Sequence, residues 1–132
     1  MSTAPILELP KFDTGEYCGS DFLMTQGGAS LVIHIDEQPP FEILFNRVRW
    51  HQFTALPNCT PEMIQGAYFR LIELPDSASL AHFLQQDSSP RKAYRSLHHY
   101  RIFLDETGCH ELFAESAATP NLPLNPDATF AI

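Results

Sequence analysis

The segment HHYRIFLDETGCHELFAE, residues 98–115, decides the fold class because it predicts a β-hairpin. Apolar and polar side chains alternate on both sides of a turn at residues 105–108, and Gly108 supplies the positive φ that a short loop with a bulge requires. Pairing Asp105 with Cys109 then predicts two faces. The apolar face contains Tyr100, Ile102, Leu104, Leu112 and Ala114. The other face contains His99, Arg101, Phe103, Asp105, Glu111, Phe113 and Glu115.

On the second face an arginine lies near two acids. In this register Arg101 faces Phe113 and is diagonal to both Glu111 and Glu115. Opposite charges at such positions attract each other across antiparallel strands. We therefore expect Arg101 to form a structural ion pair with Glu111 or Glu115. The alternative is that Arg101 contacts a partner or an anionic ligand.

The chain before the hairpin predicts further strands and one main helix. Apolar alternation and β-forming residues indicate strands over 30–36, 41–45, 47–55 and 67–74. Residues 60–66 predict a one-turn helix, and Asp76 or Ser77 caps a helix over about 77–86. Its buried stripe contains Leu80, Phe83 and Leu84. This order predicts an α+β, mainly β fold: an antiparallel sheet, with folding into a sandwich as an option, and the 77–86 helix packed on it.

Both ends of the chain look less regular. Prolines and glycines make residues 1–30 turn-rich, with a short edge strand predicted over 6–9. Residues 117–132 form a Pro-rich, acidic tail that we expect to be extended on the surface. We predict one domain over residues 1–132, with its core over about 30–116.

Composition limits the class of protein. The chain has 132 residues, 44% of them hydrophobic and 18% charged, which is typical of one globular domain. The net charge of −8, with one small basic cluster at Arg91, Lys92 and Arg95, argues against nucleic-acid binding. We find no apolar run long enough for a membrane span and no secretory signal, so we expect a cytoplasmic protein. Cys18, Cys59 and Cys109 are then expected to be free thiols.

Motifs for catalysis and metal binding are missing from the sequence. The six histidines show no HxH, HExxH or HxxxH spacing, so we expect no metal and no cofactor. Cys59 is the best candidate nucleophile because it precedes a predicted helical turn, and His51 on the preceding strand is its nearest histidine. The alternative is that Cys59 is an inert, buried or half-buried residue. We assign no catalytic residue, and keep a pocket near Cys59 and His51 as a weaker alternative.

Several segments resemble a pattern in small bacterial proteins of unknown function. They are AYFRLIEL at 67–74, the helix around 80–83, HYRIFLD at 99–105 and GCHEL at 108–112, within a similarity over about 30–116. Some of these proteins look like immunity proteins of toxin systems, and this resemblance implies a small acidic inhibitor that acts by surface complementarity. Together with the acidic charge, it favours a protein that binds and inhibits a partner protein. The alternative is a small enzyme or small-molecule-binding domain with a pocket near Cys59 and His51.

Overall fold

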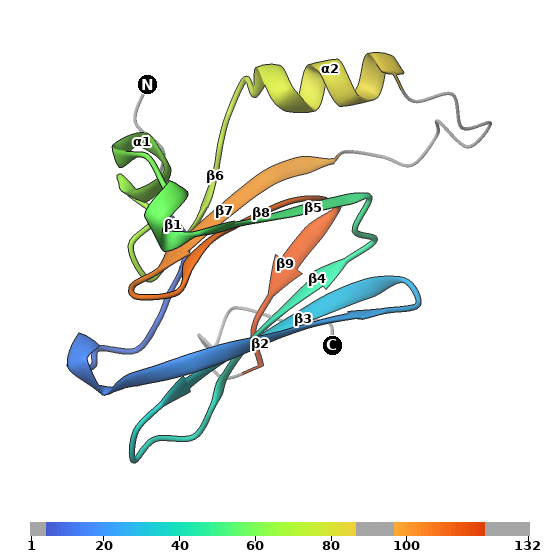
Figure 1. Cartoon of the computed structure of the whole chain (residues 1–132). Helices are drawn as coiled ribbons and strands as arrows, with labels where there is room; N and C mark the ends of the chain where they lie inside the picture. Colours follow the sequence, from blue (N-terminus) through green and yellow to red (C-terminus); the bar gives the residue numbers. More distant parts are fainter. Residues whose placement is uncertain (1–4, 87–96, 121–132) are drawn as a thin grey trace.

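Two antiparallel sheets pack face to face in the computed structural model, which describes residues 5–86 and 97–120 (Figure 1). The five-stranded sheet has the order β1-β6-β7-β8-β5, and the four-stranded sheet has the order β2-β3-β4-β9. The predicted fold class, mainly β with one main helix near residues 77–86, is confirmed. The buried stripe predicted for this helix is wrong, because none of Leu80, Phe83 and Leu84 is buried and Leu84 is 45% exposed.

The strand bounds follow the two sheets. The five-stranded sheet contains β1 (Pro5–Glu8), β6 (Arg70–Glu73), β7 (His98–Leu104), β8 (Gly108–Ala114) and β5 (Trp50–Ala55). The four-stranded sheet contains β2 (Tyr17–Thr25), β3 (Gly28–Ile35), β4 (Phe41–Asn46) and β9 (Ser116–Ala118). The helical elements are α1 (Pro61–Ile64), α2 (Ala78–Gln86) and the 3-10 turns η1 (Thr14–Glu16) and η2 (Leu56–Asn58).

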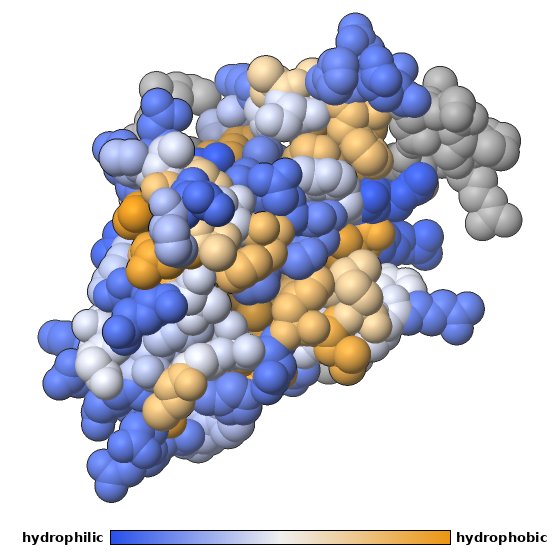
Figure 2. All heavy atoms as spheres, in the orientation of Figure 1, coloured by the Kyte–Doolittle hydropathy of each residue, from blue (hydrophilic) through white to orange (hydrophobic). Residues whose placement is uncertain are grey.

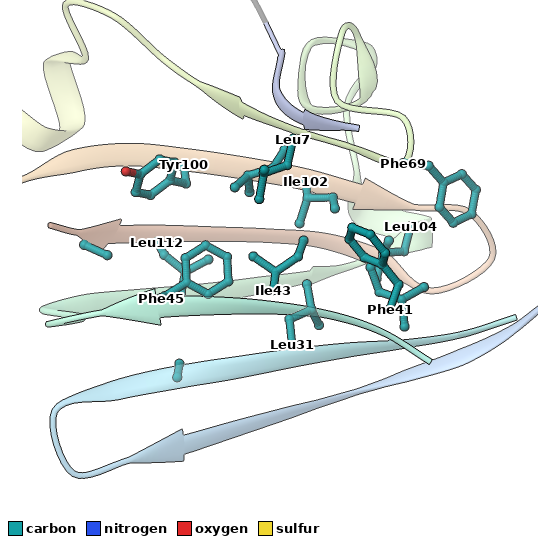
Figure 3. Packing of buried hydrophobic residues seen from close by; sticks show 14 of the residues in the cluster. Leu7, Leu31, Phe41, Ile43, Phe45, Phe69, Tyr100, Ile102, Leu104 and Leu112 are labelled. Carbon is teal, nitrogen blue, oxygen red and sulfur yellow. The ribbon is translucent and has the colours of Figure 1, made fainter. Parts of the chain in front are cut away.

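The main core lies between the sheets (Figure 3). Strand β3 buries every second residue, so that Leu31 and Ile33 face Ile102 and Leu112 of the opposite sheet. All four side chains are fully buried. Each contributes about 1.5–3 kcal/mol by removal of apolar surface from water.

A second, smaller cluster lies on the outer face of the five-stranded sheet. Phe103 and Cys109 are buried there against Met63 of α1. Thr60 holds α1 in place, because its hydroxyl accepts a hydrogen bond from the Met63 N–H at 3.3 Å. Strand β8 is therefore covered on both faces, and its seven residues are all buried.

The predicted hairpin is present, but its register differs by two residues. Leu104 pairs with Gly108, and Arg101 lies directly opposite Glu111. The loop holds residues 105–107, with Glu106 at φ 66°, and Gly108, the first residue of β8, follows at φ 148°. Because the shift is an even number of residues, every side chain keeps its predicted face.

The largest error in the sequence prediction concerns residues 1–30. This segment contains the nine-residue strand β2, which pairs with β3 along its length. Its inward row consists of Ser20, Phe22 and Met24, and a register shift occurs at Gly19, so the sequence shows little alternation. Residues before position 30 also enter the core, as Leu7 and Tyr17 show.

Smaller differences concern the ends of elements. Strands β5 and β6 begin at Trp50 and Arg70, later than predicted, because Arg47 and Phe69 adopt positive φ values of 54° and 51°. Part of the expected extended tail forms β9, which pairs with β4. Residues 121–132 and the basic cluster at residues 91–95 lie outside the described residues.

Candidate functional site

A network of charged and polar side chains lies on the outer face of β7 and β8. The register places Arg101 opposite Glu111, and His99 lies two residues away on the same face. Oε1 of Glu111 lies 2.7 Å from Nε2 of His99 and 3.3 Å from Nη2 of Arg101. His99 and Glu111 are buried, and the Arg101 side chain is 17% exposed. The predicted pair of Arg101 with Glu111 is confirmed, whereas Glu115 lies 4.0 Å from Arg47 instead.

Ser77 connects this network to α2. Its hydroxyl lies 2.7 Å from Nδ1 of His99 and accepts a hydrogen bond from the Leu80 N–H at 3.0 Å. With a neutral imidazole, Nε2–H donates to Glu111 and Nδ1 accepts from the Ser77 hydroxyl. Ser77 is thus the cap predicted for this helix, and it also fixes the start of α2 on the sheet.

The charge of Glu111 is stabilised by its neighbours. Burial opposes its ionisation, but the hydrogen bond from His99 and the positive charge of Arg101 outweigh burial and lower the pKa of this carboxyl. Arg101 is held further by a hydrogen bond from Nη1 to the Glu62 carbonyl at 3.2 Å. Its buried Nε has no hydrogen-bond partner within the part of the chain that the structure describes.

A hydroxyl, an imidazole and a carboxylate that are linked one to the next by hydrogen bonds are also the groups of a nucleophilic triad. In this chain Ser77 also caps α2, and Glu111 is shared with Arg101. Phe83 of α2 packs against Phe113 beside the network, at 5.2 Å between ring centroids. These contacts give the network a structural use, which is to hold α2 on the outer face of the sheet.

The structure separates the candidate pair Cys59 and His51. His51 lies on the inner face of β5, where its Nε2 is 3.0 Å from Nδ1 of His110. Cys59 packs with Cys109 in the cluster on the outer face of the same sheet, and its thiol donates to the Thr54 carbonyl at 3.3 Å. Burial also raises the pKa of the Cys59 thiol, which is the opposite of nucleophile activation.

The two histidines on the inner face form a neutral pair. The His51 ring stacks on Phe22 of β2 at 3.9 Å, and the His110 ring lies 4.8 Å from Phe53. Burial lowers the pKa of His51, and burial together with the charge of His51 lowers the pKa of His110 to about 4. At neutral pH both rings are therefore uncharged.

The thiols differ in their surroundings. Cys18 is exposed, Cys59 is half-buried, Cys109 is buried, and all are free. Burial raises the pKa of Cys109 to about 12. Among the described residues, no three His, Cys, Asp or Glu side chains are grouped so as to hold a metal ion. None of the helices within this part of the chain is long and apolar enough to cross a membrane.

One side of the sandwich ends in two strand edges that pair with no further described strand, and the sequence does not reveal this side. Strand β2 is an edge of the four-stranded sheet and β5 is an edge of the five-stranded sheet. The stacked rings of Phe22 and His51 join these edges. We call this surface the open side and define it by β2 and β5. Figure 2 shows apolar side chains, interspersed with hydrophilic ones, on the face that carries these strands.

The open side exposes large apolar groups. Met24 is 51% exposed and Phe53 is 43% exposed, and both project from edge strands toward the gap between the sheets. Leu56, in the turn η2 that follows β5, is also exposed. Strand β5, with the sequence WHQFTA, contains no charged residue and no proline.

The residues of β5 alternate between those whose backbone groups point toward β8 and those whose backbone groups point away from it. The Leu56 N–H donates to the Thr107 carbonyl at 3.1 Å, so residues 50, 52 and 54 direct their peptide groups toward β8. His51 and Phe53 therefore direct their N–H and C=O groups outward. No described strand pairs with β5 on that side.

Comparison of the chain with protein-family models, with curated proteins and with solved structures gave no match.

Proposed function

We propose that this chain is a non-enzymatic protein that binds and inhibits a basic partner protein through the open side. The observation that carries the proposal is the pair of free strand edges, β2 and β5, with exposed apolar side chains between them. This surface offers both apolar area and unpaired backbone groups, which are the two contributions that an added strand uses.

The other sheet edges support this choice by contrast. Natural proteins protect edge strands by making them short or by placing charges and prolines on them. Edge strand β1 has four residues and begins with Pro5, and edge strand β9 has three residues. Strands β2 and β5 have nine and six residues, and β5 has neither charge nor proline. A partner that covers β5 explains why this edge lacks protection.

The charge of the molecule supports a basic partner. A net charge of −8 attracts a positively charged protein and accelerates its association. The same charge opposes the approach of a second copy of this chain. The resemblance to immunity-like proteins supports the class of inhibitor, because such proteins work by covering a surface of the partner and need no catalytic residue.

A crosslinking experiment tests the proposal. The photoreactive amino acid p-benzoylphenylalanine is placed at Phe53, and in a matched control at Leu84, which is similarly exposed on α2. We expect the Phe53 variant, irradiated in the cells that encode the chain, to capture one basic protein that the Leu84 variant does not capture. The captured protein is then purified and mixed with the unlabelled chain, where we expect a 1:1 complex.

Affinity measurements on that pair complete the test. Phe53→Lys should weaken binding by roughly 30-fold or more, which is the effect expected at an interface hot spot, while Leu84→Lys should leave it within about 2-fold. On binding, the amides of His51 and Phe53 should gain protection from hydrogen exchange, since they are the ones that face outward. Equal effects of the two lysine variants would contradict the proposal.

A further inference from the structure

A cavity of about 320 Å³ lies at the end of β1 and the start of β6. No residue of the edge strand β5 lines it. Aromatic rings and charged groups line it, among them Glu8, Lys11, Phe12, Tyr68, Phe69 and Arg70. Its volume falls at the lower end of the range of small-molecule sites, and its walls combine aromatic rings with a few polar groups, but it is wide open to solvent.

An unusual backbone conformation places two neighbouring rings in this cavity. On a regular strand Tyr68 and Phe69 would point to opposite faces. Phe69 instead adopts φ 51°, a left-handed conformation that aromatic residues rarely adopt. Its N–H donates to the Phe103 carbonyl at 2.8 Å, and the Arg70 N–H donates to the Ala67 carbonyl at 3.1 Å, which hold the turn. Strain of this kind is common at ligand sites.

The rings are arranged around Phe69. Phe12 and Tyr68 both meet it edge to face, with centroids 5.1 and 5.0 Å away. Phe69 is buried, whereas Tyr68 is 40% exposed. The hydroxyl of Tyr68 donates to Oδ2 of Asp105 at 2.8 Å, which fixes the ring. The cavity therefore presents an oriented aromatic ring to a ligand.

Two cations and one acid are among the residues that line this cavity. Lys11 and Arg70 line it, and Glu8 lies 3.0 Å from Nε of Arg70. Lys11 forms no ion pair with any described residue. Lys11 is therefore the one cation of the lining that has no acidic partner among the described residues, and the Asp105 carboxylate beside Tyr68 adds a negative charge on the other side of the ring's hydroxyl.

We propose that this cavity binds a small aromatic monoanion, such as an aryl carboxylate or sulfonate. The aromatic ring of the ligand packs against Tyr68, and its acidic group contacts Lys11 with Arg70 beside it. This site is separate from the open side, so it does not depend on the proposed binding of a partner protein.

Two matched probes test the proposal. One is 8-anilinonaphthalene-1-sulfonate, and the other is N-phenyl-1-naphthylamine, which has the same rings without the sulfonate. We expect the sulfonate to bind with a stoichiometry of one and more tightly than the amine, by fluorescence titration. Lys11→Gln should weaken sulfonate binding by about 2- to 5-fold and leave amine binding unchanged, while Arg47→Gln, at an exposed arginine elsewhere, should change neither.

The aromatic contact is tested separately. Tyr68→Ala should weaken both probes by about 5-fold, and Tyr68→Phe, which keeps the ring, should retain binding. Circular dichroism checks that each variant is folded, and the Lys11 comparison decides the question if Tyr68→Ala unfolds. The proposal is overturned if the sulfonate binds no better than the amine or if Lys11→Gln has no effect. Loss of probe binding in Phe53→Lys would place the probe on the open side and would also overturn it.

Discussion

The two faces of strand β8 carry buried polar groups of opposite character. Glu111 points to the outer face, where it pairs with His99 and Arg101 beneath α2. His110, the preceding residue, points to the inner face, where it pairs with His51 among aromatic rings. The outer group is charged, whereas the inner pair is neutral at pH 7.

This difference suggests separate roles for the two faces, with the outer face serving stability and the inner face, at its open edge, serving binding. On the outer face the carboxylate of Glu111 has two cationic or hydrogen-bonding partners, and α2 closes the network through Ser77. On the inner face the histidine pair ends at a free strand edge, next to the exposed ring of Phe53. We therefore expect substitutions on the outer face to affect folding most strongly, and those at the open side to affect binding.

The largest effect is expected from Glu111→Ala. Removal of this carboxylate leaves the Arg101 guanidinium and the His99 ring buried without their shared partner. The cost is about 3–5 kcal/mol, as found when one member of a buried ion pair is removed. Urea denaturation measures it, and Glu115→Ala is the matched control, with an expected loss below about 1 kcal/mol because its contact with Arg47 is 4.0 Å long and exposed on one side.

A double-mutant cycle sharpens this comparison. Arg101→Ala combined with Glu111→Ala should be less destabilising than the sum of the single changes, by at least about 1 kcal/mol, because each removes the same interaction. Arg101→Ala combined with Glu115→Ala should be additive. Additivity in both cycles would mean that the pair of Arg101 and Glu111 contributes nothing to folding.

The next largest effect is expected from pH, through His110. Its pKa is about 4 in the folded state and 6.5 in the unfolded chain, so only the unfolded chain gains this proton as pH falls from 6.5 to 4. The free energy of unfolding should therefore be fully retained above pH 6.5, and should fall by about 2 kcal/mol between pH 7.5 and 5 through this group alone. Urea titrations of the wild type and of His110→Gln across this range give the difference. An equal pH dependence of the two proteins would contradict the assignment.

Glu111 contributes in a separate pH range. Its folded-state pKa is lowered, so its contribution is present above the ordinary value of 4.5 and is lost as pH falls below it. The interval from pH 7.5 to 5 therefore reports on the inner face, and more acidic conditions report on the outer face.

Local signals in the sequence predicted which side chains share a face of the hairpin, but not the exact register or all the contacts between them. Gly108 indicated the turn, and alternation alone placed His99, Arg101 and Glu111 together. The exact register depended on a left-handed residue at Glu106, which the sequence does not indicate. Opposite charges do not predict the contact of His99 with Glu111, although both residues lie on one face, because it is a hydrogen bond from an imidazole.

The sequence does not predict features that depend on contacts between distant parts of the chain. The open side depends on which strands become sheet edges, and this is decided by the packing of two sheets rather than by any local pattern. Strand β2 was missed because its inward row includes the polar Ser20 and two half-exposed or exposed residues, Phe22 and Met24. The cavity near Lys11 depends on the positive φ of Phe69. The sequence does not indicate this conformation, because residues 67–74 have the pattern of a regular strand.

A moderate effect is expected from Ser77→Ala. The change removes the cap of α2, worth about 1 kcal/mol, and the hydrogen bond to His99, so the total loss should be about 1–2 kcal/mol. Ser77→Asn, which retains a capping oxygen, should restore part of the loss. Proteolysis near α2 should accelerate in Ser77→Ala, because the helix has no fully buried side chain of its own. A loss equal to that of Ser79→Ala, at the second residue of the helix, would show that the network does not hold α2.

The smallest effect on folding is expected at the open side, from Phe53→Lys. The ring is 43% exposed and lies on an edge strand, so lysine can extend its charged end into water while its methylene groups cover the same neighbours. The free energy of unfolding should therefore change by less than about 0.5–1 kcal/mol, as for an ordinary surface substitution. Phe103→Lys, at a fully buried ring of the outer cluster, is the opposite case and should prevent folding. If Phe53→Lys destabilised the protein by several kcal/mol, the ring would be part of the core, and its exposure would no longer argue for a partner. A Phe53→Lys variant that is stable but fails to bind would show that this aromatic side chain serves binding. Folding alone would then not explain why an exposed ring lies on this uncharged edge strand.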